Sequence, residues 1–166
     1  MMPVSAAYLS RLPGHPGSRL EVTLCYPENV PVDKDEVLKI TLPMGAGIDD
    51  YFENRLGGEN ILVYTFHIPN ELGTRPDLAS IGLVHQKPTN KHVLKDVVGE
   101  LFRFLHENQL VSVDMLKEHL PRIVDAINAE KKLTIHAGKN KHVFDIPAFI
   151  AKRNEEIVQP LKSLWG

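Results

Sequence analysis

The chain has 166 residues, 43% of them hydrophobic and 24% charged, with a formal net charge of -2 at pH 7. This apolar content predicts a folded domain and excludes extensive disorder. The near-neutral charge argues against a protein that coats nucleic acid, and the lone cysteine, Cys25, excludes an internal disulfide scaffold. No stretch approaches the roughly 18 apolar residues of a membrane-spanning helix. We therefore expect a cytoplasmic protein with a reduced thiol and no membrane partner.

Turn-forming residues dominate the start of the chain. Prolines and glycines recur within residues 1–18, which predicts a flexible or draped arm. Alternating apolar and polar residues over 19–26 predict a half-buried strand, and a second strand is expected over 37–42, ending before Pro43. Residues 44–53 then predict a glycine loop that opens a short helical turn capped by an aspartate.

The middle of the chain changes from strand to helix periodicity. Residues 61–68 and 78–85 are mostly apolar, and 61–68 is dense in β-formers, which predicts a central hairpin of buried strands. Apolar residues then recur at helical spacing over 90–108, which predicts a helix with Thr89 or Asn90 as its cap.

The next part of the chain predicts a helix and a hairpin. Ser112 is expected to cap a helix over 113–130, which either kinks or restarts near Pro121. A short hairpin is predicted for residues 133–136 and 142–146, on either side of a turn.

A last helix is predicted from about Pro147, with a break at Pro160. Its inward-facing residues are expected to be Ile150, Ile157, Leu161 and Leu164. Because the strands are grouped before the helices, the sequence predicts the α+β class, with a mainly antiparallel sheet of about five to six strands packed against two or three helices. We expect one domain over residues 19–166.

The glycine loop is the candidate ligand site. The candidate ligand-binding residues are Gly45, Gly47, Asp49, Asp50, His67 and His85. The glycines would let backbone N–H groups approach an anion, and either aspartate could hold a divalent ion or act as a base. One of the two strand histidines would shuttle a proton near neutral pH. This site is the basis of an alternative function, a small metal- or anion-binding enzyme. The other interpretation is a glycine-rich turn with an aspartate cap, since the lysine and hydroxyl of a P-loop are absent.

The eight histidines lack the spacing of a metal site, and no cofactor is expected. His136 and His142 would face each other only in a suitable register of the last hairpin. Charge is unevenly distributed, with acids in residues 33–36 and 49–53 and lysines in residues 131–141. Two regions of opposite sign favour head-to-tail or partner contacts over nucleic acid.

Two aromatic residues are candidate interface anchors. Phe104 lies outside the main apolar stripe of its predicted helix, and Trp165 lies one residue from the end of the sequence. The alternative is that Phe104 widens the core and Trp165 folds back onto the domain. The preferred function is a non-enzymatic protein-interaction or regulatory module that self-associates, as a homodimer, or binds a protein partner.

The predicted strands 61–68 and 78–85, followed directly by the helix 90–108, are similar to the core of longin and roadblock-type domains. The phrase Asp77-Leu78-Ala79-Ser80-Ile81 contributes to this resemblance, which covers about a third of the chain. Such α+β modules dimerise and act as platforms for small GTPases or for trafficking and regulatory complexes. The resemblance therefore implies a regulatory domain and assigns no functional residue.

Overall fold

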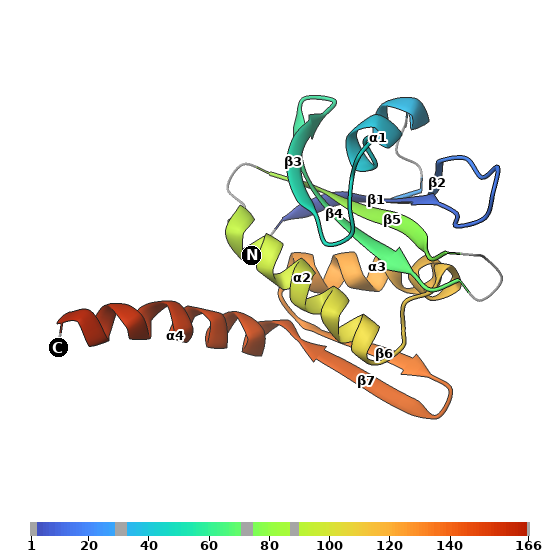
Figure 1. Cartoon of the computed structure of the whole chain (residues 1–166). Helices are drawn as coiled ribbons and strands as arrows, with labels where there is room; N and C mark the ends of the chain where they lie inside the picture. The colour runs from blue at the N-terminus through green and yellow to red at the C-terminus, as the bar shows by residue number, and fades with distance from the viewer. Residues whose placement is uncertain (1–2, 29–32, 71–74, 87–89, 166) are drawn as a thin grey trace.

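The computed structural model describes residues 3–28, 33–70, 75–86 and 90–165, with residues 158–165 described by their backbone alone. Within these residues the chain forms a five-stranded antiparallel sheet, a two-stranded antiparallel sheet and four helices (Figure 1). The predicted α+β class with a mainly antiparallel sheet is confirmed.

The large sheet has the strand order β2-β1-β5-β4-β3, and β6 pairs with β7. Helix α1 packs on one face of the large sheet, and α2 and α3 pack on the other (Figure 1). The elements in chain order are β1 (Val4–Leu12), β2 (Glu21–Tyr26), α1 (Lys34–Thr41), β3 (Tyr51–Leu56), β4 (Glu59–Ile68), β5 (Asp77–His85), α2 (Lys91–Glu107), α3 (Val113–Ala129), β6 (Lys132–Ala137), β7 (Asn140–Asp145) and α4 (Ile146–Trp165).

Strand β1 stands where the sequence predicted an N-terminal arm, so that prediction is wrong for residues 4–12. The strand lies inside the sheet, where Ala7 pairs with Tyr26 of β2 on one side and with Leu83 of β5 on the other. Most of its side chains are buried. The prolines and glycines that suggested an arm lie around the strand, mainly in the connection to β2.

Helix α1 replaces the strand predicted over 37–42, which is wrong. The Asp33 carboxylate accepts two backbone N–H groups of the first turn, at 3.1 and 3.3 Å, and so begins the helix. Two acidic residues in that turn complement the helix dipole. Val37 and Thr41, four residues apart, are the buried positions. The apolar residues that suggested a strand therefore form one side of a short amphipathic helix.

Strand β3 replaces the helical turn predicted within residues 44–53, which is also wrong. Tyr51 pairs with Tyr64 of β4, and the two strands are joined by a turn at Gly57 and Gly58. Both glycines have positive φ, which a tight hairpin of this hand requires. The predicted β4–β5 hairpin, the helices α2 and α3 and the β6–β7 hairpin are confirmed.

Helices α3 and α4 both contain a proline without ending there. Helix α3 runs through Pro121 and α4 runs through Pro160, so the predicted restart and break are wrong. Ile157 was predicted to face inward, but its side chain is 50% exposed. Figure 1 shows the C-terminal part of α4 extending away from the rest of the molecule. The side chains of Leu161 and Leu164 lie outside the described residues.

The two faces of the large sheet carry cores of different size. The large core lies between the sheet and the helices α2 and α3 and includes the contacting rings of Tyr64, Phe66 and Phe102. The small core lies beneath α1. Its buried residues are Ala6, Tyr8, Val37, Ile61, Val63 and Val84.

Candidate functional site

The glycine loop between α1 and β3 is closed by its own hydrogen bonds. The Asp50 carboxylate accepts the Gly47 N–H at 2.7 Å, and the Asp50 N–H donates to the Thr65 hydroxyl at 3.0 Å. Backbone bonds of 2.8 and 2.9 Å join Asp49 and Asp50 to Thr65 of β4. Gly45 has φ +87, which favours glycine. Two of the N–H groups that an anion would use are therefore bonded within the protein, as in a turn capped by an aspartate.

Asp49 is held by Tyr64 of β4. The Tyr64 hydroxyl donates to the Asp49 carboxylate at 2.6 Å. Burial raises the pKa of Tyr64, and the bond to Asp49 raises it further, so the phenol stays protonated and remains a donor. The Tyr64 ring lies 4.7 Å from the ring of Tyr51 and 5.2 Å from that of Phe102. Nothing in the sequence around Tyr64 pointed to this contact.

The structure separates the two candidate histidines. His67 pairs with Leu78 and His85 pairs with Asn60 in the β4–β5 register. They therefore lie near opposite ends of the strand pair, about 20 Å apart along the strands. His85 is far from the glycine loop along β4, whereas His67 lies on the part of β4 that follows the loop's contacts with Thr65.

His67 stacks on His106 of α2, a partner that sequence reasoning missed. Their ring centroids are 4.5 Å apart, with 19° between the planes. Burial lowers the pKa of His106, and His67 lowers it further, whereas Asp49 acts in the opposite direction. In the last hairpin, His136 pairs with Lys141 and not with His142. Among the described residues, no three His, Cys, Asp or Glu side chains are grouped so that they could hold a metal ion.

An apolar groove, here called the α1 groove, runs beside the C-terminal half of α1. Its volume is about 690 Å³. Leu12 and Leu78, which pair across β1 and β5, supply its strand residues. Leu20 is 43% exposed, and Met44 is fully exposed. The groove is lined by Leu12, Leu20, Asp35, Leu38, Lys39, Leu42, Pro43, Met44, Gly45, Ala46 and Leu78.

The local fold explains why this groove is open. Helix α1 ends at Thr41, and the chain then turns away through the glycine loop. The ends of β1 and β5 are therefore left without a helix above them. The glycine loop, singled out in the sequence as an anion site, supplies one wall of an apolar groove instead. No sequence signal identified Leu12 or Leu78, because they become neighbours only through the sheet.

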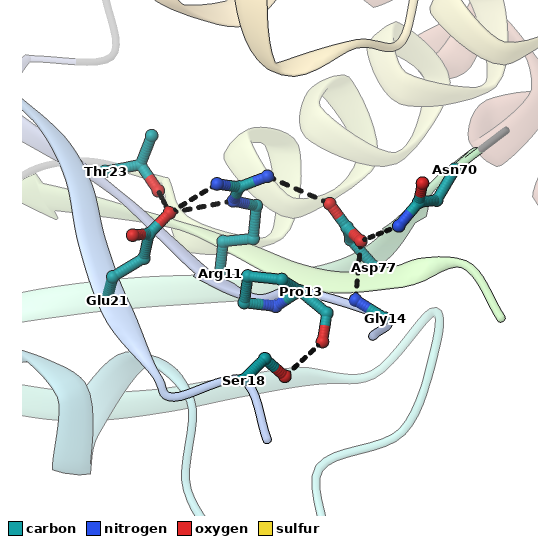
Figure 2. Close-up of polar contacts among 8 residues, drawn as sticks. All are labelled: Arg11, Pro13, Gly14, Ser18, Glu21, Thr23, Asn70 and Asp77. Carbon is teal, nitrogen blue, oxygen red and sulfur yellow. Dashed lines mark hydrogen bonds and ion pairs between the residues drawn. The ribbon is translucent and has the colours of Figure 1, made fainter. Parts of the chain in front are cut away.

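A buried polar network holds the wall that carries Leu20. Figure 2 shows Arg11 between Glu21 and Asp77, donating to their carboxylates at 2.6 and 3.0 Å. The other oxygen of Asp77 accepts from the Gly14 N–H at 2.7 Å and from the Asn70 side chain at 2.9 Å. The network thus joins the connection between β1 and β2 to the beginning of β5.

Gly14 is required at this contact by close packing of the backbone. A Cβ atom added to Gly14 would lie 2.0 Å from the carbonyl oxygen of Arg75. The connection carrying Leu20 is consequently packed against the start of β5 as well as bonded to it. This arrangement gives the α1 groove a fixed wall rather than a loose loop.

A second cavity, of about 540 Å³, lies between α2 and α4 and is lined mainly by charged residues. Arg153 of α4 donates to Asp96 of α2 at 2.5 Å. Arg103 bonds to Glu100 at 2.7 Å on the same helix. These ion pairs fix the beginning of α4 on α2, so we assign this cavity a structural role.

The two candidate interface aromatics differ in what the structure describes. Phe104 packs against Phe144 of β7, with ring centroids 5.5 Å apart, and Phe144 in turn lies 6.2 Å from Phe149. Phe104 therefore widens the large core. Trp165 ends α4, and its side chain lies outside the described residues.

Cys25 is a free, partly buried thiol on β2. Burial raises its pKa, which lowers the fraction of reactive thiolate. Within the described part of the chain, no helix is both long and apolar enough to cross a membrane. Comparison with known proteins finds no matching family model and no significant match to a curated protein.

Proposed function

We propose that the chain is a non-enzymatic protein-interaction module that self-associates in the cytoplasm, with the α1 groove as its docking surface. The observation that carries this proposal is the exposure of Met44 and Leu20 on opposite walls of an apolar groove. Grouped exposed apolar side chains are typical of interaction surfaces. Methionine is also common where a binding surface must adapt to its partner.

The placement of polar groups supports docking over chemistry at this groove. Asp35 and Lys39 lie four residues apart on α1 and are the charged members of its lining. The aspartates of the neighbouring loop bond to Gly47, Tyr64 and Thr65. An apolar centre with a charged margin is the usual anatomy of a protein interface.

The resemblance to longin and roadblock-type domains is part of the same proposal. Its support is the antiparallel β4–β5 pair with α2 on the adjoining face, which is the arrangement on which the resemblance depends. A regulatory platform of this kind needs a surface that receives another protein, and the α1 groove provides one. The raised pKa of the Cys25 thiol supports a protein whose cysteine stays reduced and unreactive.

Sedimentation of matched loop variants tests the proposal. We expect the wild-type chain to associate in the micromolar range, and Met44→Lys to weaken its association constant at least about tenfold. Ile48→Lys is the matched control, because Ile48 is 51% exposed in the same loop but does not line the groove. Wild-type protein that remains monomeric at high micromolar concentration would contradict the proposal, as would equal effects of the two substitutions in folded protein.

A further inference from the structure

The β6–β7 hairpin has one buried face and one exposed face. Leu133, Ile135 and Phe144 are buried in the large core. Side chains alternate along each strand, so the neighbouring positions face outward. This outer hairpin face consists of Lys132, Thr134, His136, Lys141 and Val143. Val143 is 42% exposed, so the face has an apolar residue among basic ones.

The hairpin is the most basic segment of the chain. Residues 131–144 contain four lysines and no acidic residue. Lys132 has an acidic neighbour within reach, Asp145, at 3.7 Å, and both side chains are exposed. An exposed pair of this kind contributes little, so it leaves the positive character of the face largely intact.

The α1 groove has the opposite charge. Residues 33–50 contain five acidic residues against two lysines, a net charge of -3. Asp35 lines the groove itself, and Asp49 and Asp50 are exposed on the loop that forms its wall. The groove and the outer hairpin face therefore each combine apolar residues with charge, and the charges have opposite signs. Complementarity of this kind selects partners and orients them.

The two surfaces lie on opposite sides of one molecule. Helix α1 contacts β1, β2, β3 and β5, whereas the hairpin contacts α3 and α4 on the far side of the sheet (Figure 1). A chain cannot bring its own hairpin to its own groove. A second copy can do so, and pairing groove with groove would instead place acidic residues against each other.

We propose that the α1 groove of one copy binds the outer hairpin face of a second copy, with Val143 entering between Met44 and Leu20. This inference rests on the proposed self-association and adds its geometry. The contact is heterologous, because different surfaces of the two copies meet. Each dimer retains one free groove and one free hairpin, so association continues beyond two copies unless a ring closes.

Mixing two defective variants tests this geometry. Met44→Lys damages the groove and Val143→Lys damages the hairpin, and each variant alone should lose association at least about tenfold. Mixed at equal amounts, the intact hairpin of one should bind the intact groove of the other and restore association. The complex should stop at a 1:1 dimer, because the remaining surfaces present lysine to lysine.

The controls separate this inference from the proposed function. Lys141→Glu is a second hairpin variant, used if Val143→Lys fails to fold by circular dichroism, and should also weaken association. Ile157→Lys on α4 should leave association unchanged. If both single variants lose association and mixing restores nothing, or if only the groove or α4 variant matters, the head-to-tail contact is wrong although self-association stands. A wild-type monomer would overturn the proposed function itself.

Discussion

The two faces of the large sheet solve the problem of covering a sheet very differently. On one face two 17-residue helices, α2 and α3, bury an apolar core with contacting aromatic rings. On the other, an eight-residue helix covers six buried apolar residues. This face also buries four hydroxyl groups. They belong to Ser10, Thr41, Thr65 and Ser80.

The difference separates stability from recognition. The α2 and α3 face contains most of the buried apolar residues and therefore most of the hydrophobic stabilisation. The α1 face contributes less and leaves the ends of β1 and β5 open as the α1 groove. Alternate residues of the same strands thus serve two purposes, because the side chains of a strand point alternately to either face.

The largest expected effect compares a core residue from each face. Phe102→Ala should lower the free energy of unfolding by about 3–5 kcal/mol, because Phe102 is fully buried and its ring lies 4.4 Å from that of Phe66. Val37→Ala on α1 should lower it by about 2 kcal/mol. Urea denaturation measures both. Equal losses would break the comparison between the two faces.

A somewhat smaller loss is expected from the network in Figure 2. Asp77→Ala removes a buried carboxylate and leaves Arg11 and the Gly14 N–H without this acceptor. We expect a loss of about 2 kcal/mol, because Arg11 keeps Glu21 and is partly exposed to water. Self-association should weaken as well, since the network positions the wall that carries Leu20. Urea denaturation and sedimentation measure the two effects, and unchanged values in both would contradict this role.

The buried hydroxyls beneath α1 should respond unequally. Thr41 accepts from Ser10 at 2.8 Å while donating to a backbone carbonyl at 2.7 Å. Thr41→Val should therefore cost about 1 kcal/mol, because Ser10 would lose its partner. The Ser80 hydroxyl has no partner among the described residues, so Ser80→Ala should leave stability unchanged or raise it slightly. Thermal denaturation of both variants distinguishes them, and a larger loss for Ser80→Ala would contradict the comparison.

The smallest expected effect is a pH dependence on the α2 side. The pKa of His106 is lowered from 6.5 in the folded protein, mainly by burial and then by the stacked His67. The unfolded chain therefore binds the proton more tightly. Stability is fully present above about pH 6.5 and is lost as the pH falls through the lower folded value. His106→Gln should flatten this decline in urea denaturation between pH 7 and 5, and an unchanged slope would exclude His106 as its source.

The sequence predicted the elements whose periodicity is strong and missed those decided by contacts elsewhere. The helix α2 and the β4–β5 hairpin follow from regular spacing of apolar residues. The segment Val37–Thr41 contains β-branched residues and was assigned to a strand, yet the Asp33 cap and burial against the sheet favour a helix. Strand β1 was missed because the prolines and glycines around it obscured a short buried run.

The candidate site was predicted in position but not in character. The sequence identified the glycine loop, and the structure places Gly45 in the lining of the α1 groove. The other lining residues come from β1, β5 and α1 and meet only through sheet pairing. Leu12 beside Leu78 and the stacked His67 and His106 are such contacts. Linear spacing carries no information about them.

The position of β5 also sets the order in which the sheet can assemble. β5 is the last of the five sheet strands along the chain, yet it lies at the centre, between β1 and β4. Leu9 therefore pairs with Ile81, more than 70 residues later. During synthesis, β1 and β2 can form one ribbon and β3 and β4 another, but neither can join the other until β5 emerges. The fold should accordingly form late and cooperatively, limited by closure of this long loop.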